Sequence, residues 1–131
     1  MKSTMQGRHL FEYAVIRVVP HVEREEFVNV GVILFCHGLK FLDTRMTLNA
    51  TRIRAFCEEI DLDEVQAHMS SFQQICNGGK GAGRIGELPM RERFRWLTAS
   101  RSTILQTSPV HPGMLEDPRE MLDRLFEQLV K

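Results

Sequence analysis

Two groups of polar and charged residues carry the side chains that could do chemistry in this 131-residue sequence. The first group lies in two strand-like segments near the N-terminus and consists of Arg17, Glu26, Asn29 and Gly31. The second lies in the segment 93–113 and consists of Arg101, Ser102, Gln106 and His111. An arginine among apolar residues binds a carboxylate or a phosphate, and a histidine exchanges protons near neutral pH. The residue types therefore indicate anion binding, with His111 as the one candidate acid or base.

The segment Arg24–Phe35 joins a charged cluster to an apolar run that Asn29 and Gly31 interrupt. Side chains alternate along a strand, so the even-numbered aliphatic residues would form one buried face, and Asn29 and Gly31 would lie on the other. A short hairpin turn would place Arg17 opposite Asn29 and predicts a polar notch beside the space at Gly31, where Glu26 could supply a carboxylate. A β-bulge at Gly31, with Arg17 at a sheet edge, accounts for the same residues without a site. The sequence leaves both interpretations open.

Other familiar kinds of site have little support. The stretch Gly81–Gly86 matches G-x-G-x-x-G, but it follows a predicted helix end instead of a strand, so we expect a connector and no cofactor. The five histidines and three cysteines show no metal-ligand spacing, and no metal site is predicted. No nucleophile motif is present. The arginines of the segment 84–101 form either a basic patch for a phosphate or acidic partner, or a solvated helix face.

Length and composition indicate a single domain, residues 1–131, of an ordinary globular protein. Apolar residues make up 43% and charged residues 26% of the chain. The formal net charge is +0, which weighs against a dedicated nucleic-acid binder. The sequence contains neither a secretion signal nor an apolar run of membrane-spanning length. We therefore expect a cytoplasmic protein with reduced cysteines and no membrane contact.

The predicted elements define an α+β fold. Three strands at 13–20, 26–35 and 39–46 form an antiparallel meander, and the segment 102–107 adds a fourth strand, followed by an ordered turn. Helices are predicted at 50–60, 64–76 and 88–99, and a last helix starts at Pro118. The sequence thus predicts a mainly antiparallel sheet of about four strands with helices packed on one face. Residues 1–10 are expected to form a loosely ordered tail, and 77–87 a flexible glycine-rich loop.

Two blocks of the sequence resemble a known family. The first is Y-x-x-x-R-x-x-P from Tyr13 to Pro20, followed by R-x-E-F-x-N-x-G-V from Arg24 to Val32. The second is the segment Arg93–Gly113, before the terminal helix. Together they resemble the small bacterial family known as domain of unknown function 3037, over about Tyr13 to Val130. The resemblance implies no established activity. It does imply a protein partner, a kinase similar to the toxin HipA, because genes of this family often lie beside the gene of such a kinase.

We therefore expect an accessory or regulatory protein-binding module instead of an enzyme. Its contact surface would combine the notch with the segment Arg93–His111. The alternative is a small enzyme or ligand binder for a phosphate-bearing molecule, a nucleotide or a nucleic acid. In that case Arg17, Arg101 and Ser102 would hold the anion, and His111 would be the acid or base. A homodimer paired through a sheet edge is a third hypothesis.

Overall fold

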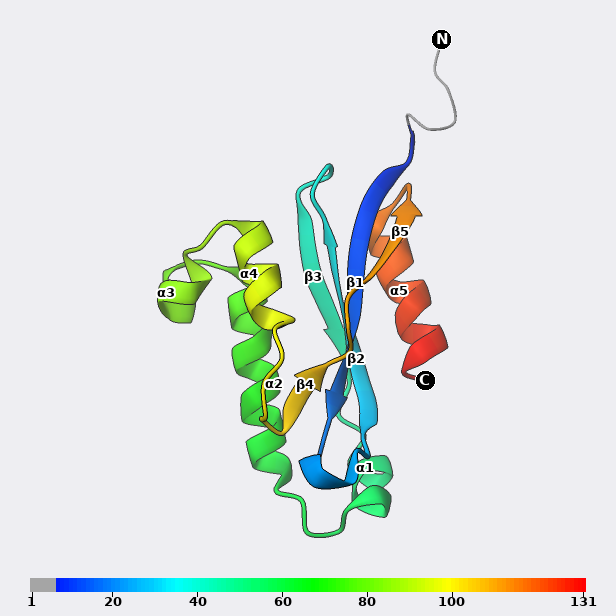
Figure 1. Ribbon diagram of the computed structural model, residues 1–131, viewed down its shortest axis with the longest axis vertical. Coiled ribbons are helices and arrows are strands. Elements are labelled where there is room, and N and C mark those ends of the chain that lie inside the picture. Colours follow the sequence, from blue (N-terminus) through cyan, green and yellow to red (C-terminus); the bar gives the residue numbers. More distant parts are fainter. Residues whose placement is uncertain (1–6) are drawn as a thin grey trace.

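The computed structural model describes residues 7–131 and consists of one antiparallel sheet with helices on both of its faces (Figure 1). The strands are β1 His9–Val18, β2 Val28–Cys36, β3 Phe41–Met46, β4 Leu105–Thr107 and β5 His111–Leu115. The helices are α1 Ala50–Phe56, α2 Leu62–Asn77, α3 Gly83–Gly86, α4 Met90–Leu97 and α5 Pro118–Leu129, with short 3₁₀ turns at Val22–Arg24 and Lys80–Ala82. The strand order is β3-β2-β1-β4, and β5 also pairs with β1. The α+β class and the three-stranded meander are confirmed.

The helices form two separate layers. The helices α1, α2 and α4 pack on one face of the sheet and contribute to the main hydrophobic core. The helix α5 packs on the opposite face, over β2 and β3, in a second core (Figure 1). The expectation of helices on one face only is therefore wrong. The reason is visible in β2, where every residue from Gly31 to Cys36 is buried, as in a strand that is covered on both sides.

A β-bulge in β2 explains its interrupted pattern. Ile16 pairs with Gly31 and Arg17 pairs with Asn29, so Val30 is an extra residue. The bulge reverses the alternation, because Val28 and Val30 face the main core whereas Val32 and Leu34 face the α5 core. The pairing of Arg17 with Asn29 agrees with the predicted register, but the predicted division of β2 into two faces is wrong. The interpretation as a notch gave the correct pairing of Arg17 with Asn29, and the alternative interpretation correctly included a β-bulge.

The outer strand of the sheet is broken in two, and the second half was missed in the sequence. Both β4 and β5 pair with β1, and Ser108 bridges the break between them. The Val15 backbone N–H donates to Ser108 Oγ over 2.9 Å, and the Ser108 N–H donates to the Val15 carbonyl over 2.8 Å. The sequence suggested a turn at β5, because Pro112 and Gly113 are typical turn residues. At an edge the missing N–H of proline costs nothing, and a side chain at Gly113 would meet the Phe11 ring at 2.6 Å.

The helix boundaries follow local signals. Asn49, Asp61 and Asp117 accept backbone N–H bonds as N-caps. The segment 77–87 contains the turn Lys80–Ala82 and α3, and the Gly79 N–H donates to the Gly86 carbonyl over 2.8 Å. Of the predicted tail 1–10, residues 1–6 lie outside the described residues, and β1 already begins at His9. None of the helices between residues 7 and 131 has the length and apolar character needed to cross a membrane.

The thiol of Cys76 is buried in the main core near the end of α2 and makes stability depend on alkaline pH. Burial, followed by the Asp43 carboxylate, raises the pKa of Cys76 from 9.0 to about 12, and Arg93 opposes this rise. As the pH passes 9, the unfolded chain loses this proton first, so folding stability is present below that pH and is lost above it. We expect a loss of up to about 1.4 kcal/mol per pH unit.

Urea unfolding at a series of alkaline pH values would measure this slope. The variant Cys76→Ala should show a smaller slope, whatever its stability at neutral pH. Equal slopes in the two proteins would show that another group controls the alkaline loss.

Candidate functional site

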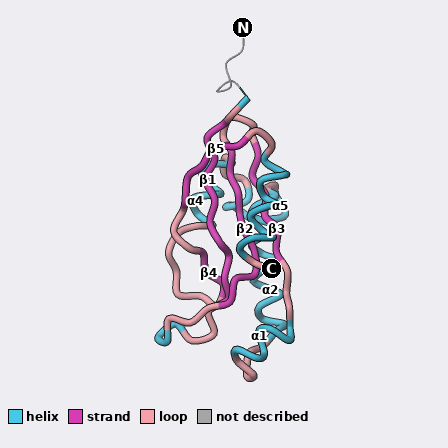
Figure 2. Tube along the Cα trace, turned by 90° about the vertical axis from the view of Figure 1, so that its right-hand side faces the viewer, coloured by secondary structure: helices cyan, strands magenta, loops and turns pink. Residues whose placement is uncertain are grey.

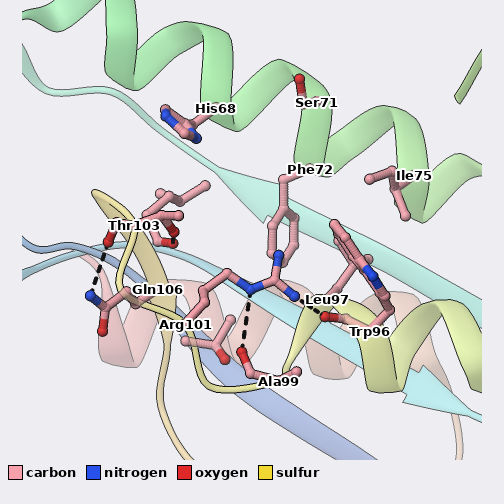
Figure 3. Close-up of a pocket in the computed structure, with 12 residues that line it drawn as sticks. His68, Ser71, Phe72, Ile75, Trp96, Leu97, Ala99, Arg101, Thr103 and Gln106 are labelled. Atoms are coloured by element: carbon pink, nitrogen blue, oxygen red, sulfur yellow. Dashed lines mark hydrogen bonds between the residues drawn. The ribbon is translucent and has the colours of Figure 1, made fainter. Parts of the chain in front are cut away.

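A cleft lies between α2, the end of α4 and the segment that leads into β4 (Figure 3). Its volume is about 250 Å³. Twelve residues line the cleft: His68, Ser71, Phe72, Ile75, Trp96, Leu97, Ala99, Arg101, Thr103, Leu105, Gln106 and Thr107. These residues come from two separate parts of the chain, 68–75 and 96–107, and the fold brings them together.

The floor of the cleft is apolar and rigid. Phe72, Leu97 and Leu105 are buried members of the main core. Phe72 belongs to the buried stripe of α2 that the sequence predicts, and Leu97 belongs to the inward face of α4. A ligand group that enters the cleft would therefore meet preformed hydrocarbon surface, which favours an apolar group.

An arginine stacked on a tryptophan forms the wall opposite α2. The Cζ atom of Arg101 lies 4.2 Å from the centroid of the Trp96 ring. The guanidinium donates to the Trp96 carbonyl and, through Nε, to the Ala99 carbonyl over 3.4 Å. Partial burial lowers the pKa of Arg101 from its ordinary value, but an arginine stays charged in proteins. The cleft thus presents a fixed cation beside an indole ring. Trp96 is 38% exposed, so a ligand can reach it.

The polar residues of the rim mainly hold the chain in place. Gln106 Nε2 donates to the Thr103 carbonyl over 2.9 Å, and Thr103 Oγ1 donates to the Leu105 carbonyl over 2.7 Å. On α2, the His68 imidazole lies 3.9 Å from Glu64. In the described part of the chain, His68 makes no hydrogen bond to a serine or cysteine, and no three metal-ligating residues cluster.

The notch lies on the other face of the sheet. Arg17 Cζ lies 3.9 Å from the Phe27 ring centroid, and Asn29 Nδ2 donates to the Leu129 carbonyl over 3.0 Å. Burial lowers the pKa of Arg17. Its Nε atom and the Asn29 Oδ1 atom are buried and have no hydrogen-bond partner within residues 7–131. Glu26, which the sequence suggested as a partner, instead pairs with Arg24 at 2.6 Å.

The structure divides the predicted site residues into several places. Gly31 turns away from the notch, because a side chain there would meet Met46 and the Arg45 carbonyl of β3. Arg101 and Gln106 line the cleft, whereas Ser102 is exposed and is not part of its lining. His111 lies opposite Tyr13, with ring centroids 5.3 Å apart.

The predicted combination of Arg17 with Arg101 and Ser102 is not formed. Ile16 and Val18, which flank Arg17, face the main core, so Arg17 points to the side of the sheet away from the cleft. Trp96, His68 and the α2 wall of the cleft were not predicted from the sequence. The one signal for Trp96 was a single tryptophan inside an arginine-rich helix.

Comparison with known proteins gives a family and no further likeness. The model of the family described as "Protein of unknown function (DUF3037)" matches residues 13–130. No curated protein and no solved structure matches the chain.

Proposed function

This chain belongs to the DUF3037 family of proteins of unknown function, and we propose that it is an accessory protein-binding module of the bacterial cytoplasm. The partner inserts an apolar side chain into the cleft and places an acceptor group beside Arg101. The observation that carries this proposal is the Trp96–Arg101 stack above the apolar floor.

Three properties of the cleft favour a protein over a small substrate. Tryptophan and arginine are the residue types that most often dominate binding energy at protein interfaces. The Arg101 side chain is already fixed by two carbonyls, so little rotamer freedom remains to be lost on binding. The volume of about 250 Å³ fits one large side chain and lies below the usual size of a small-molecule site.

The partner that we propose is the HipA-like kinase that the family resemblance implies. This part of the proposal draws on the resemblance and on no contact in the structure. It makes the chain a regulator of an enzyme, with no chemical step of its own.

Removal of the Trp96 ring is expected to weaken the partner complex about tenfold or more, because an interface tryptophan contributes about 2 kcal/mol. The partner is first identified by affinity purification of the tagged chain from its host and mass spectrometry. Calorimetric titration with the purified partner then compares Trp96→Ala and Arg101→Gln with the unaltered chain. The matched control is Arg95→Gln, an exposed arginine of the same helix outside the cleft lining.

Thermal unfolding checks that each variant is folded. Unchanged affinity in both cleft variants, with a confirmed partner in hand, would exclude the cleft as the interface. Purification of the chain without any stoichiometric protein would argue against the accessory function itself.

A further inference from the structure

One strip of the sheet surface lies beside the α5 core and outside the cleft. Viewed from the α5 side, Figure 2 shows the helix lying over β2 and β3, with β1, β4 and β5 beside it. Of the β1 side chains that point to this side, Phe11 is buried in the α5 core and Tyr13 packs against the edge of that core, partly buried, while Arg17 belongs to neither core. They alternate with Ala14 and Ile16, which face the main core.

Aromatic rings and a cation alternate on this surface. The Tyr13 ring lies 5.3 Å from the exposed His111 ring, and the Arg17 guanidinium lies 3.9 Å from the Phe27 ring. Phe27 is 43% exposed. Tyr13 and Arg17 are four positions apart on the same face of β1, which separates the two pairs by about 13 Å. We call Tyr13, His111, Arg17 and Phe27 the sheet row.

The charge of Arg17 has no counter-charge in the described part of the protein. None of the ion pairs within residues 7–131 includes it, and Glu26, the acidic partner that the sequence suggested, is held by Arg24. The neighbouring helix end does not neutralise it either. Asn29 binds the Leu129 carbonyl and Arg52 binds the Val130 carbonyl over 2.6 Å, so the last carbonyls of α5 are already occupied.

An unpaired, partly buried guanidinium near the end of β1 is costly to keep. The buried Arg17 Nε and Asn29 Oδ1 atoms without partners add to that cost. Such groups are rare in native proteins, and a ligand that completes their surroundings is one explanation for their presence.

We propose that the sheet row binds single-stranded nucleic acid. One base stacks on the Tyr13–His111 pair, a phosphate pairs with Arg17, and a second base contacts Phe27. This ligand class combines flat rings, which can stack on the aromatic side chains of the sheet row, with phosphates, which can pair with Arg17. The separation of about 13 Å along β1 exceeds the distance between a base and its own phosphate, so the shortest ligand is a dinucleotide.

The net charge of the chain limits the expected affinity. A chain with formal net charge +0 has no general attraction for polyanions, so binding is weak and depends on local contacts. Each phosphate contact on a single strand contributes about −0.7 to the slope of log K against log salt concentration. We expect a slope of about that size, with Arg17 as its source.

Fluorescence anisotropy with a labelled RNA of about eight nucleotides, and with DNA of the same sequence, tests this proposal on the full chain. Arg17→Gln is expected to weaken binding about tenfold and to abolish the salt dependence. Arg17→Lys should keep the salt dependence and lose part of the affinity, since the ammonium retains the charge but lacks the planar stack on Phe27. His111→Ala, at an exposed position, should weaken binding about fivefold through lost stacking.

The matched controls are Trp96→Ala and Arg101→Gln, which alter the cleft on the other face and should leave oligonucleotide affinity unchanged. The two proposals can therefore fail separately, because the cleft variants affect only the protein partner. Absence of salt-dependent binding, or equal affinity of Arg17→Gln and the unaltered chain, would overturn the proposal. Binding of an acidic peptide to the sheet row in place of the oligonucleotides would overturn it as well.

Discussion

Replacement of Phe126 by alanine is expected to lower the free energy of unfolding by about 3–5 kcal/mol. The Phe126 ring is 2% exposed and lies at the centre of the core that α5 forms on β2. Arg45 of β3 also packs on this ring, with Cζ 4.3 Å from the centroid. Truncation removes the buried ring, leaves a cavity and takes away the surface on which Arg45 rests.

Urea denaturation followed by circular dichroism measures this loss. Because small domains are stable by only about 5–15 kcal/mol, the variant should unfold at a much lower urea concentration. The control is Leu10→Ala, whose side chain is 62% exposed and which should change stability by less than about 0.5 kcal/mol. Similar midpoints for the two variants would mean that α5 contributes little to the folded state.

Substitution of Gly31 by valine is expected to destabilise the protein by about 1–3 kcal/mol, although valine is the better strand residue. Strand preference alone would favour valine by about 1 kcal/mol. An added Cβ atom would meet Met46 Cγ at 2.5 Å and the Arg45 carbonyl at 2.7 Å. The methionine can rotate away, but the carbonyl belongs to the β2–β3 ladder and cannot, so the clash outweighs the preference.

The same denaturation experiment applies, with Gly81→Ala as the control, because no atom lies within 4 Å of an added Cβ there. The control should be close to neutral. A Gly31→Val protein as stable as the original would show that β3 can shift outward at this point without cost.

Local signals in the sequence predicted most of the fold. The N-caps Asn49, Asp61 and Asp117 and the apolar spacing of the helices identified all the longer helices, but α1 ends at Phe56 instead of at the predicted residue 60. The sequence offered a β-bulge at Gly31 as one of two interpretations, but it could not place the extra residue at Val30, because a bulge is defined only by the pairing of β2 with β1. The unbroken apolar run from Val32 to Cys36 indicated that a second face of the sheet is covered, because a strand covered on one face would not need it.

The candidate site was less predictable than the fold, for a physical reason. The pairing of Arg17 with Asn29 depends on one hairpin, and the sequence contains its strands and its turn. The cleft depends on where α2 and α4 come to lie relative to the strand that follows them. His68, Trp96 and Gln106 meet only through that packing, and no spacing along the chain records it.

The broken outer strand has a consequence for the behaviour of the protein at high concentration. A long unpaired edge is a template on which other chains add strands and grow into aggregates. Here the edge offers only β4, of 3 residues, and β5, of 5 residues, on either side of the turn at Ser108. Pro112 further removes one hydrogen-bond donor from the longer piece. The edge formed by β4 and β5 therefore lacks the continuous ladder that cross-β polymerisation requires.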